Sequence, residues 1–362
     1  MKKINVALIF GGKSGEHEVS LSSASSIYRY INKEKYNIYT IGITKDGNWM
    51  YYEGDVEKIE NGSWEKEAKK DVKINLIPTL NQKVGLEFGD NTFKEIDVLF
   101  PVLHGPYGED GSIQGLFEIS NIAYVGCNVL ASSVGMDKLV CKKVFEQENI
   151  PQVKYTYTTR CEFNNDEEGQ LRSIESMIPY PIFIKPANLG SSVGISKANN
   201  KKELIKGIKE ALEYDRRVVL EEGVNAKEIE VSVLGNEEIK ASVVGEIIPA
   251  KEFYDYEAKY LNKESKLIIP ATIEESISEK IREMAINAFK SIDGSGLSRV
   301  DFFVEKQTNN IYINEINTMP GFTNISMYPK LWESTGISYD KLIDELINLA
   351  LKRHEEKLAK KI

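Results

Sequence analysis

The feature that most constrains the fold is a series of apolar runs that alternate with helical patterns in the first third of the 362 residues. The first run, INVALIF at 4–10, is continuously apolar and is followed by Gly-Gly and a helical pattern at 19–31. Further apolar runs lie at 36–44 and 96–105. Continuous apolar strands are typical of sheets covered on both faces, and strands that alternate with helices pair in parallel. The N-terminal part is therefore predicted to be an α/β unit with a mostly parallel sheet.

Beyond residue 130 the pattern changes to shorter strands and amphipathic helices. Apolar spacing predicts a helix at 135–151 that ends at Pro151, and antiparallel strands at 228–235 and 238–247. The other predicted elements are strands at 181–187, 217–223, 298–305 and 310–317, the last two forming a hairpin, and helices at 201–214, 277–292 and 339–362. Residues 50–95 are polar and short of pattern, and we expect a small hairpin and surface elaboration there.

Charge and cysteine content exclude several classes of protein. A formal net charge of −9 without a basic run argues against a nucleic-acid or anionic-membrane partner. Anionic small molecules stay compatible with the composition, because local lysines and a metal can reverse the field inside a cleft. The three cysteines, Cys127, Cys141 and Cys161, form no CxxC pair, which indicates reduced thiols. The apolar run at 4–10 is too short for a signal peptide and no stretch approaches about 20 apolar residues, so we expect a cytoplasmic protein.

Oxygen-bearing side chains end the hairpin at 298–317. Strand alternation predicts that four residues share one face of its second strand: Ile311, Ile313, Glu315 and Asn317. Alternation in the first strand places Arg299 and Asp301 on one face. If the two faces coincide, Asp301, Glu315 and Asn317 form a patch of hard oxygen ligands of the kind that Mg²⁺ prefers. The alternative is a solvated face on which Arg299 only pairs with Asp301. The three histidines show no metal-ligand spacing.

A Gly/Ser-rich loop, KPANLGSSVG at 185–194, follows the strand at 181–187. Backbone N–H groups of such a loop can surround phosphate oxygens, and Lys185 would add a positive charge. A flexible surface loop is the alternative. Glu221 stands at a predicted strand end, where it could accept hydrogen bonds from the amino group or ribose hydroxyls of a nucleotide, and Glu228 lies seven residues further on.

The order of these parts resembles a known superfamily. Lys138 on a helix, Lys185 before the loop, Glu221 at a strand end, then Arg-x-Asp and Glu-x-Asn follow one another as in ATP-grasp enzymes. Four longer motifs are more specific: GGKSGEHEVSLSSA at 11–24, HGPYGEDGSIQG at 104–115, YDYEAKY at 254–260 and NEINTMPGFTNISMYP at 314–329. With them, nearly the whole chain resembles the D-alanine–D-alanine ligases, and residues 50–95 do so least.

The resemblance implies a mixed α/β and α+β fold with the three-domain ATP-grasp architecture. Its expected parts are an N-terminal parallel α/β substrate-binding domain at 1–126, a central ATP-grasp subdomain at 127–224, and a C-terminal subdomain at 225–362 with the metal site. The polar segment 250–270 would be a lid that closes over ATP and excludes water.

The resemblance also implies roles for single residues. Catalytic roles fall on Glu16, Ser191, Arg299 and Tyr260. Substrate contacts fall on His104, Gly321, Ser326, Met327 and Lys259. ATP contacts fall on Lys138, Lys185, Gly190, Ser192, Glu221, Glu222, Val224, Glu228 and Lys259. One or two Mg²⁺ or Mn²⁺ ions would bind to Asp301, Glu315 and Asn317.

The implied reaction joins two D-alanine molecules. ATP would phosphorylate the carboxylate of the first, and the amine of the second would attack the acylphosphate and release phosphate. The resemblance further implies a homodimer. Alternatives are a ligase that forms D-alanyl-D-serine or D-alanyl-D-lactate, or an inactive ATP-grasp module that only binds nucleotide.

Overall fold

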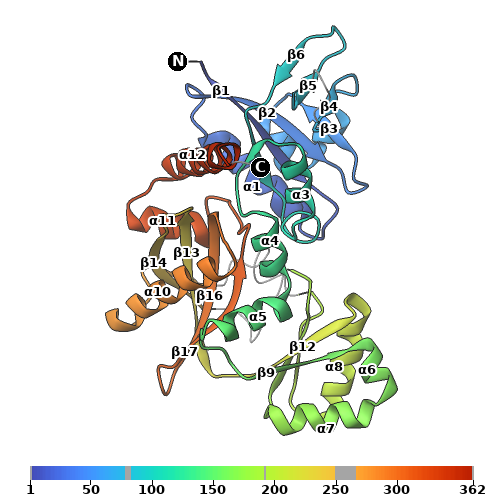
Figure 1. Ribbon diagram of the computed structural model, residues 1–362, viewed down its shortest axis with the longest axis vertical. Coiled ribbons are helices and arrows are strands. Elements are labelled where there is room, and N and C mark those ends of the chain that lie inside the picture. The colour runs from blue at the N-terminus through green and yellow to red at the C-terminus, as the bar shows by residue number, and fades with distance from the viewer. Residues whose placement is uncertain (1, 78–82, 191–192, 249–265, 361–362) are drawn as a thin grey trace.

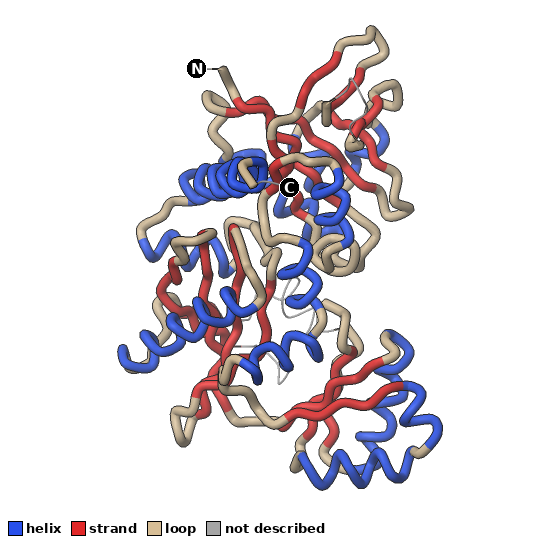
Figure 2. The backbone as a smooth tube through the Cα atoms, in the orientation of Figure 1, coloured by secondary structure: helices blue, strands red, loops and turns tan. Residues whose placement is uncertain are grey.

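The computed structural model describes residues 2–77, 83–190, 193–248 and 266–360 (Figure 1). In these ranges the strands form four sheets. Figure 2 shows the three larger sheets one after another along the long axis of the molecule. The mixed α/β and α+β fold predicted from the sequence is confirmed, and the division into domains at 126 and 224 stays a prediction.

The first sheet has the strand order β3-β2-β1-β7-β8. Strand β1 pairs in parallel with β2 and β7, and only the edge strand β3 runs antiparallel to its neighbour, so the mostly parallel sheet is confirmed. Burial on both faces explains the continuous apolar run, because Val6 to Phe10 are at most 1% exposed. The elements of this part are β1 Ile4–Gly11, α1 His17–Tyr30, β2 Tyr36–Ile43, β3 Trp49–Tyr52, β7 Val98–Val102, α3 Ser112–Ile119 and β8 Ala123–Tyr124.

Residues 50–95 contribute more than surface. The predicted hairpin is confirmed, and a third strand extends it to the sheet β4-β5-β6. The interpretation as surface elaboration is wrong for Trp64, which is fully buried in the core beneath β2. A Cβ at Gly42 would lie 2.2 Å from the Trp64 ring, so the ring fits because that strand position is glycine. The elements are α2 Val56–Glu60, the 3₁₀ helix η1 Ser63–Lys66, β4 Lys73–Asn75, β5 Gly85–Glu87 and β6 Phe93–Glu95.

The central sheet has the order β11-β10-β12-β9 with antiparallel pairs throughout. Helices α7 and α8 cover it through an apolar cluster that includes Leu171, Ile184 and Leu204. The elements from residue 129 on are α4 Val129–Met136, α5 Lys138–Gln147, β9 Tyr155–Thr159, α6 Arg160–Asn165, α7 Glu167–Met177, β10 Ile182–Pro186, β11 Ser196–Ala198, α8 Lys201–Tyr214 and β12 Arg217–Glu222.

The third large sheet has the order β15-β14-β13-β16-β17. One of its faces packs against α10 through a cluster that contains Ile229, Val231, Phe302 and Phe289. The opposite face carries the polar residues that alternate with these apolar ones. The elements are β13 Ala226–Gly235, β14 Lys240–Ile248, β15 Lys266–Ile268, α10 Glu275–Ser291, β16 Gly296–Glu305, β17 Ile311–Asn317, α11 Met327–Thr335 and α12 Tyr339–Leu358.

The last helix returns to the first sheet (Figure 1). Leu342 and Leu346 of α12 share one apolar core with Leu8 of β1. Arg353 donates from Nη2 to the Tyr124 carbonyl oxygen at 2.9 Å, and its guanidinium lies 4.4 Å from the centre of the Tyr124 ring. The N-terminal and C-terminal parts of the chain are therefore held together. In the same region, α1 lies beside the loop that follows β17.

Candidate active site

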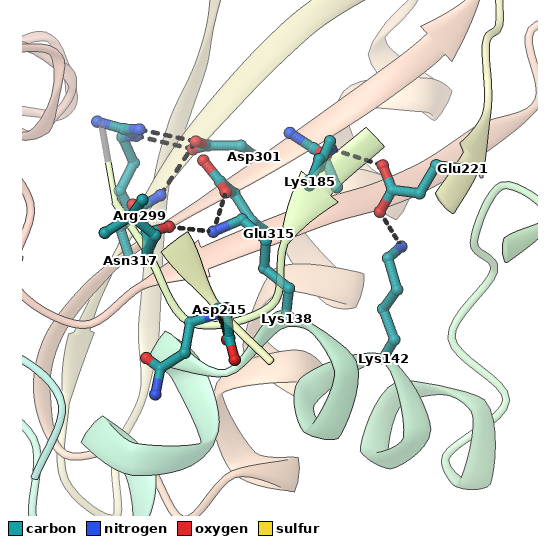
Figure 3. A network of polar contacts seen from close by, with 12 residues as sticks. Lys138, Lys142, Lys185, Asp215, Glu221, Arg299, Asp301, Glu315 and Asn317 are labelled. Atoms are coloured by element: carbon teal, nitrogen blue, oxygen red, sulfur yellow. Dashed lines mark hydrogen bonds and ion pairs between the residues drawn. The ribbon is translucent and has the colours of Figure 1, made fainter. Parts of the chain in front are cut away.

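The hairpin β16–β17 brings the three predicted oxygen ligands together. Asp301 is the register partner of Glu315, and Arg299 is the partner of Asn317. Asn317 Nδ2 donates to Asp301 Oδ2 at 3.1 Å (Figure 3). Two carboxylates and an amide oxygen form a hard donor set, and Mg²⁺ usually takes one or two protein carboxylates in addition to substrate phosphates. These residues fit such an ion, while no group of three His, Cys, Asp or Glu side chains suited to a metal occurs among the described residues.

The predicted alternation along β17 is wrong, because the strand contains a bulge. The register shifts between Asp301 and Phe302, so that Asn314 is an extra residue on β17. Ile313 and Ile316 both face the α10 core, three positions apart, and Glu315 does not share the face of Ile313. The bulge has a consequence for the site: the Asn314 side-chain oxygen accepts a hydrogen bond from Lys185 Nζ at 3.2 Å.

Arg299 is held between two carboxylates. Its Nε and Nη2 donate to the two oxygens of Asp301, each at 2.7 Å, and its Nε lies 3.0 Å from Glu230 Oε2 on the neighbouring strand β13. Burial opposes the charge of Arg299, yet its pKa is raised well above the ordinary value because Asp301 and then Glu230 outweigh the burial. The guanidinium is therefore a permanent, fixed cation at the edge of the oxygen ligands.

Lys185 and Lys142 both pair with Glu221 (Figure 3). Lys185 Nζ lies 2.5 Å from one Glu221 oxygen and Lys142 Nζ lies 2.8 Å from the other. Burial alone would raise the pKa of Glu221, but the two ammonium groups lower it to about 2. Both carboxylate oxygens are thus engaged by lysines, and a contact of Glu221 with nucleotide stays a prediction. Lys142 was missed from the sequence, although it lies four residues after Lys138 and so on the same helix face.

Lys138 connects the Gly/Ser loop with the oxygen ligands. It is the first residue of α5, whose N-cap Asp137 accepts from the Val140 N–H. Lys138 Nζ donates to the Leu189 carbonyl oxygen at 2.7 Å and lies 4.0 Å from Glu315 Oε2. Lys138 and Lys185 therefore stand on the same side of the third sheet as Asp301 and Glu315, as the prediction required.

Glu16 and His104 lie where the first sheet meets this region. A Cβ on Gly105 would be 2.7 Å from Glu16 Oε2, and one on Gly190 would be 3.0 Å from the same atom, so the buried carboxylate sits between both loops. Nδ1 of His104 lies 2.9 Å from the Met319 carbonyl oxygen. Burial lowers the pKa of His104, against the opposing effect of Glu16, so the ring is held neutral.

Glu109 belongs to the motif HGPYGEDGSIQG, received no role from the sequence, and lies half-buried in the same place. It accepts a hydrogen bond from the Gly105 N–H at 2.9 Å. Burial, and then the negative charge of Glu16, raise the pKa of Glu109 to about 8. Glu16 and Glu109 thus form a carboxylate pair in which Glu109 tends to keep its proton at neutral pH.

The residues expected to hold a second substrate lie at the start of α11. Ser326 is the N-cap of this helix, and a Cβ on Gly321 would come within 3.1 Å of its hydroxyl. The Met327 side chain points away from that position, since it is buried with Ile247 and Leu331. The predicted contact of Met327 with a substrate would therefore have to come from its backbone at the helix start.

Three other predicted residues lie on or between β12 and β13. Glu222 ends β12, Val224 lies in the loop before β13, and Glu228 lies on β13. Burial alone would lower the pKa of Lys185, but Glu221 and Glu315, and then Glu228, raise it. Four predicted site residues, Ser191, Ser192, Lys259 and Tyr260, and most of the predicted lid lie outside the described residues. In the described part of the chain no helix is long and apolar enough to cross a membrane.

Comparisons with known proteins identify the family. The family model described as D-ala D-ala ligase N-terminus matches residues 5–127, and the one described as D-ala D-ala ligase C-terminus matches residues 144–348. A D-alanine–D-alanine ligase of Acetivibrio thermocellus is 54% identical, with 98% of each chain covered, and D-alanine–D-alanine ligase B of Clostridium tetani is 52% identical over 97% of this chain and 94% of its own length.

Solved structures show the same similarity. The VanG D-Ala:D-Ser ligase from Enterococcus faecalis superimposes with a TM-score of 0.86 at 39% identity, covering 96% of this chain and 100% of its own. The D-alanine–D-alanine ligase from Coxiella burnetii also gives 0.86, at 35% identity, covering 99% of this chain and 97% of its own. The family resemblance inferred from the sequence is confirmed, and the chain belongs to the D-alanine–D-alanine ligase family.

Proposed function

We propose that this enzyme joins two D-alanine molecules to D-alanyl-D-alanine at the expense of ATP, through a D-alanyl phosphate, to supply a peptidoglycan precursor. The observation that carries the proposal is the cluster of Arg299, Asp301, Glu315 and Asn317 facing Lys138. It combines oxygen ligands for a metal–nucleotide complex, cations for phosphate oxygens and a fixed guanidinium for an oxyanion, which are the groups that the reaction needs.

Asp301, Glu315 and Asn317 would hold one or two Mg²⁺ or Mn²⁺ ions. When bound, such ions would offset the negative charge that develops in phosphoryl transfer. The chain itself supplies the remaining charges: Lys138 and Lys185 reach toward the same volume from α5 and β10. Gly190 would contact ATP as part of the loop whose backbone N–H groups bind phosphate oxygens. The adenosine would be surrounded by Glu221, Glu222, Val224 and Glu228.

In the first step the carboxylate of one D-alanine attacks the terminal phosphorus of ATP, the bond from that phosphorus to the bridging oxygen breaks, and ADP leaves. Glu16 would bind the ammonium group of that D-alanine, and its burial between Gly105 and Gly190 fixes the carboxylate beside the phosphate loop. Neutral His104 would lie near the same substrate. Because the His104 ring is uncharged, it does not repel the ammonium group that Glu16 would bind.

In the second step the amine of the other D-alanine attacks the acylphosphate carbonyl. Arg299 would stabilise the oxyanion of the tetrahedral intermediate, because a fixed cation costs no reorganisation when the charge develops. Gly321, the Ser326 hydroxyl and the backbone of Met327 would hold the second D-alanine, whose carboxylate suits the N-terminus of α11.

Further parts of the proposal concern residues outside the described ranges and the assembly. Tyr260 would reach Ser191, and Ser191 would reach Glu16, so that a lid at 250–270 closes over the substrates; Ser192 and Lys259 would contact phosphate. The proposal also includes three domains, at 1–126, 127–224 and 225–362, and a homodimer. It places the enzyme in the cytoplasm, since ATP and D-alanine are small soluble substrates.

Product analysis tests the proposal. Purified enzyme with ATP and Mg²⁺ receives equal concentrations of D-alanine, D-serine and D-lactate, and all products are quantified by mass spectrometry. We expect D-alanyl-D-alanine to dominate and phosphate release to depend on D-alanine. Dominant D-alanyl-D-serine or D-alanyl-D-lactate would assign a different acceptor, and no D-alanine-dependent phosphate release would indicate a nucleotide-binding module.

A further inference from the structure

Three carboxylates stand at one level across neighbouring strands of the third sheet. Glu230 on β13 is the register partner of Asp301 on β16, and Asp301 is the partner of Glu315 on β17. All three lie on the face away from α10. Carboxylates directly opposite one another repel, so the row needs cations to be stable. A metal ion between Asp301 and Glu315 would neutralise the charge of these two carboxylates. Glu230 lies on the other side of Asp301 and needs a different cation.

The cation that serves Glu230 is Arg299. Glu230 Oε2 lies 3.0 Å from Arg299 Nε, and the exposed fractions of the two side chains are 6% and 16%. Asp301 binds the same guanidinium through Nε and Nη2. Two buried carboxylates therefore share one arginine, and each holds it from a different strand.

Asp301 has two tasks that compete in the proposed reaction. An oxygen that coordinates a divalent cation loses strength as a hydrogen-bond acceptor, so a metal at Asp301 loosens its fork with Arg299. Glu230 does not share this conflict, because β16 separates it from Glu315 and Asn317 on β17. Its contact with Nε can persist while Asp301 faces a metal.

We propose that Glu230 is a positioning residue that keeps the Arg299 guanidinium aimed at the reacting carbonyl when Asp301 is engaged by metal. This inference rests on the proposed function of Arg299 and adds a residue that the sequence motifs did not single out. It assigns to Glu230 no contact with substrate or metal. The plain alternative is a buried carboxylate that only stabilises the sheet.

Paired substitutions separate the two. Arg299 donates its single Nε–H to Asp301, so Glu230 acts on the guanidinium through its charge. Glu230→Met removes this charge at similar volume, and Glu230→Gln keeps a polar side chain without the charge. Glu246→Met is the matched control, because Glu246 is also buried in this sheet and pairs with Lys227 at 3.2 Å, but it lies on the opposite face as the partner of Ile229. Each variant is assayed for kcat and KM, and exchange of the Arg299 Nε–H is followed by ¹⁵N NMR in the enzyme with Mg²⁺ and ADP, the signal being assigned from its loss in Arg299→Lys.

We expect Glu230→Met to lower kcat by about tenfold to a hundredfold with both KM values within about twofold, since small misplacement of a catalytic group costs rate at that scale. Glu230→Gln should fall between it and the unaltered enzyme, Glu246→Met should keep its kcat, and Nε–H exchange should be about tenfold faster in Glu230→Met. Equal kcat in Glu230→Met and Glu246→Met, a rise in KM alone, or unchanged exchange would overturn the inference. If the unaltered enzyme shows no D-alanine-dependent turnover, the proposed function fails, and the exchange rate alone decides the role of Glu230.

Discussion

Replacing Lys142 by methionine tests whether the buried lysine pair on Glu221 holds α5, β10 and β12 together. Lys142 and Glu221 side chains are only 3% and 4% exposed, and their charged atoms are 2.8 Å apart. Methionine keeps most of the volume of the lysine stem and removes the charge. Glu221 would then keep Lys185 as its one remaining partner in this ion-pair group.

Two routes lead to a similar magnitude. The fall of the Glu221 pKa from an ordinary 4.5 to about 2 corresponds to a net effect of roughly 3 kcal/mol, which remains after burial has opposed the two lysines, at 1.36 kcal/mol per unit. Removing one member of a buried pair costs about 3–5 kcal/mol when the other is left without a partner. Because Lys185 remains, we expect Lys142→Met to lower the free energy of unfolding by about 2 kcal/mol.

Urea unfolding at neutral pH measures the loss, and Lys143→Met is the control on the same helix. Lys143 is exposed, and its Nζ lies 5.0 Å from the Tyr157 ring, so its charge should matter little. A double-mutant cycle with Glu221→Gln should show a favourable coupling of about 1 kcal/mol or more. Without Lys142 the Glu221 carboxylate is held less firmly, and Lys185, which pairs with it, is less well positioned. KM for ATP should therefore rise in Lys142→Met. A stability loss no larger than that of Lys143→Met would refute the reasoning.

Three further outcomes are expected. Asp301→Asn or Glu315→Gln should reduce turnover by about a thousandfold or more at saturating Mg²⁺, because negative charge at the oxygen ligands is lost. The circular dichroism spectrum should be unchanged, and near-normal phosphate release would contradict the metal assignment. Arg299→Lys should lower kcat by about a hundredfold, because the planar fork is lost, whereas an effect on KM alone would mean uniform binding. As the pH rises from about 4.5 to 8, the unaltered enzyme should lose stability, because folded Glu109 keeps a proton that the unfolded chain releases. Glu109→Gln lacks this effect and should therefore become progressively more stable relative to the unaltered enzyme. A constant difference in urea midpoint across this range would show that the Glu109 pKa is not raised.

The fold and the centre of the site could be predicted because they depend on local pattern. Continuous apolar runs separated by helices specify a parallel sheet, and a short connection between two alternating strands specifies a hairpin. The hairpin left open whether the faces of Asp301 and Glu315 coincide, and the register shows that they do. Lys185 was singled out by its place before the Gly/Ser loop, and Lys138 by the family resemblance.

The bulge at Asn314 could not be predicted from alternation. Ile313 and Ile316 are spaced by three, and this irregularity was the one signal in the sequence that the strand changes its pairing. A bulge is stabilised by the packing of both isoleucines against α10, which is a tertiary contact. The same cause applies to Met327, whose side chain turns toward Ile247 because the sheet offers it an apolar site there.

Lys142 and Glu230 were missed for a different reason, since their partners are far away in the chain. In the segment 228–235, Glu228 and Glu230 alternate with Ile229 and Val231, so a polar face was visible in the sequence. What alternation cannot supply is the neighbour of that face. Strand β13 lies next to β16 although β14, β15 and α10 come between them in the chain. The charge on Glu230 acquires a partner only through this non-local pairing, and a residue that positions a catalytic group from an adjacent strand is therefore the kind that sequence motifs leave out.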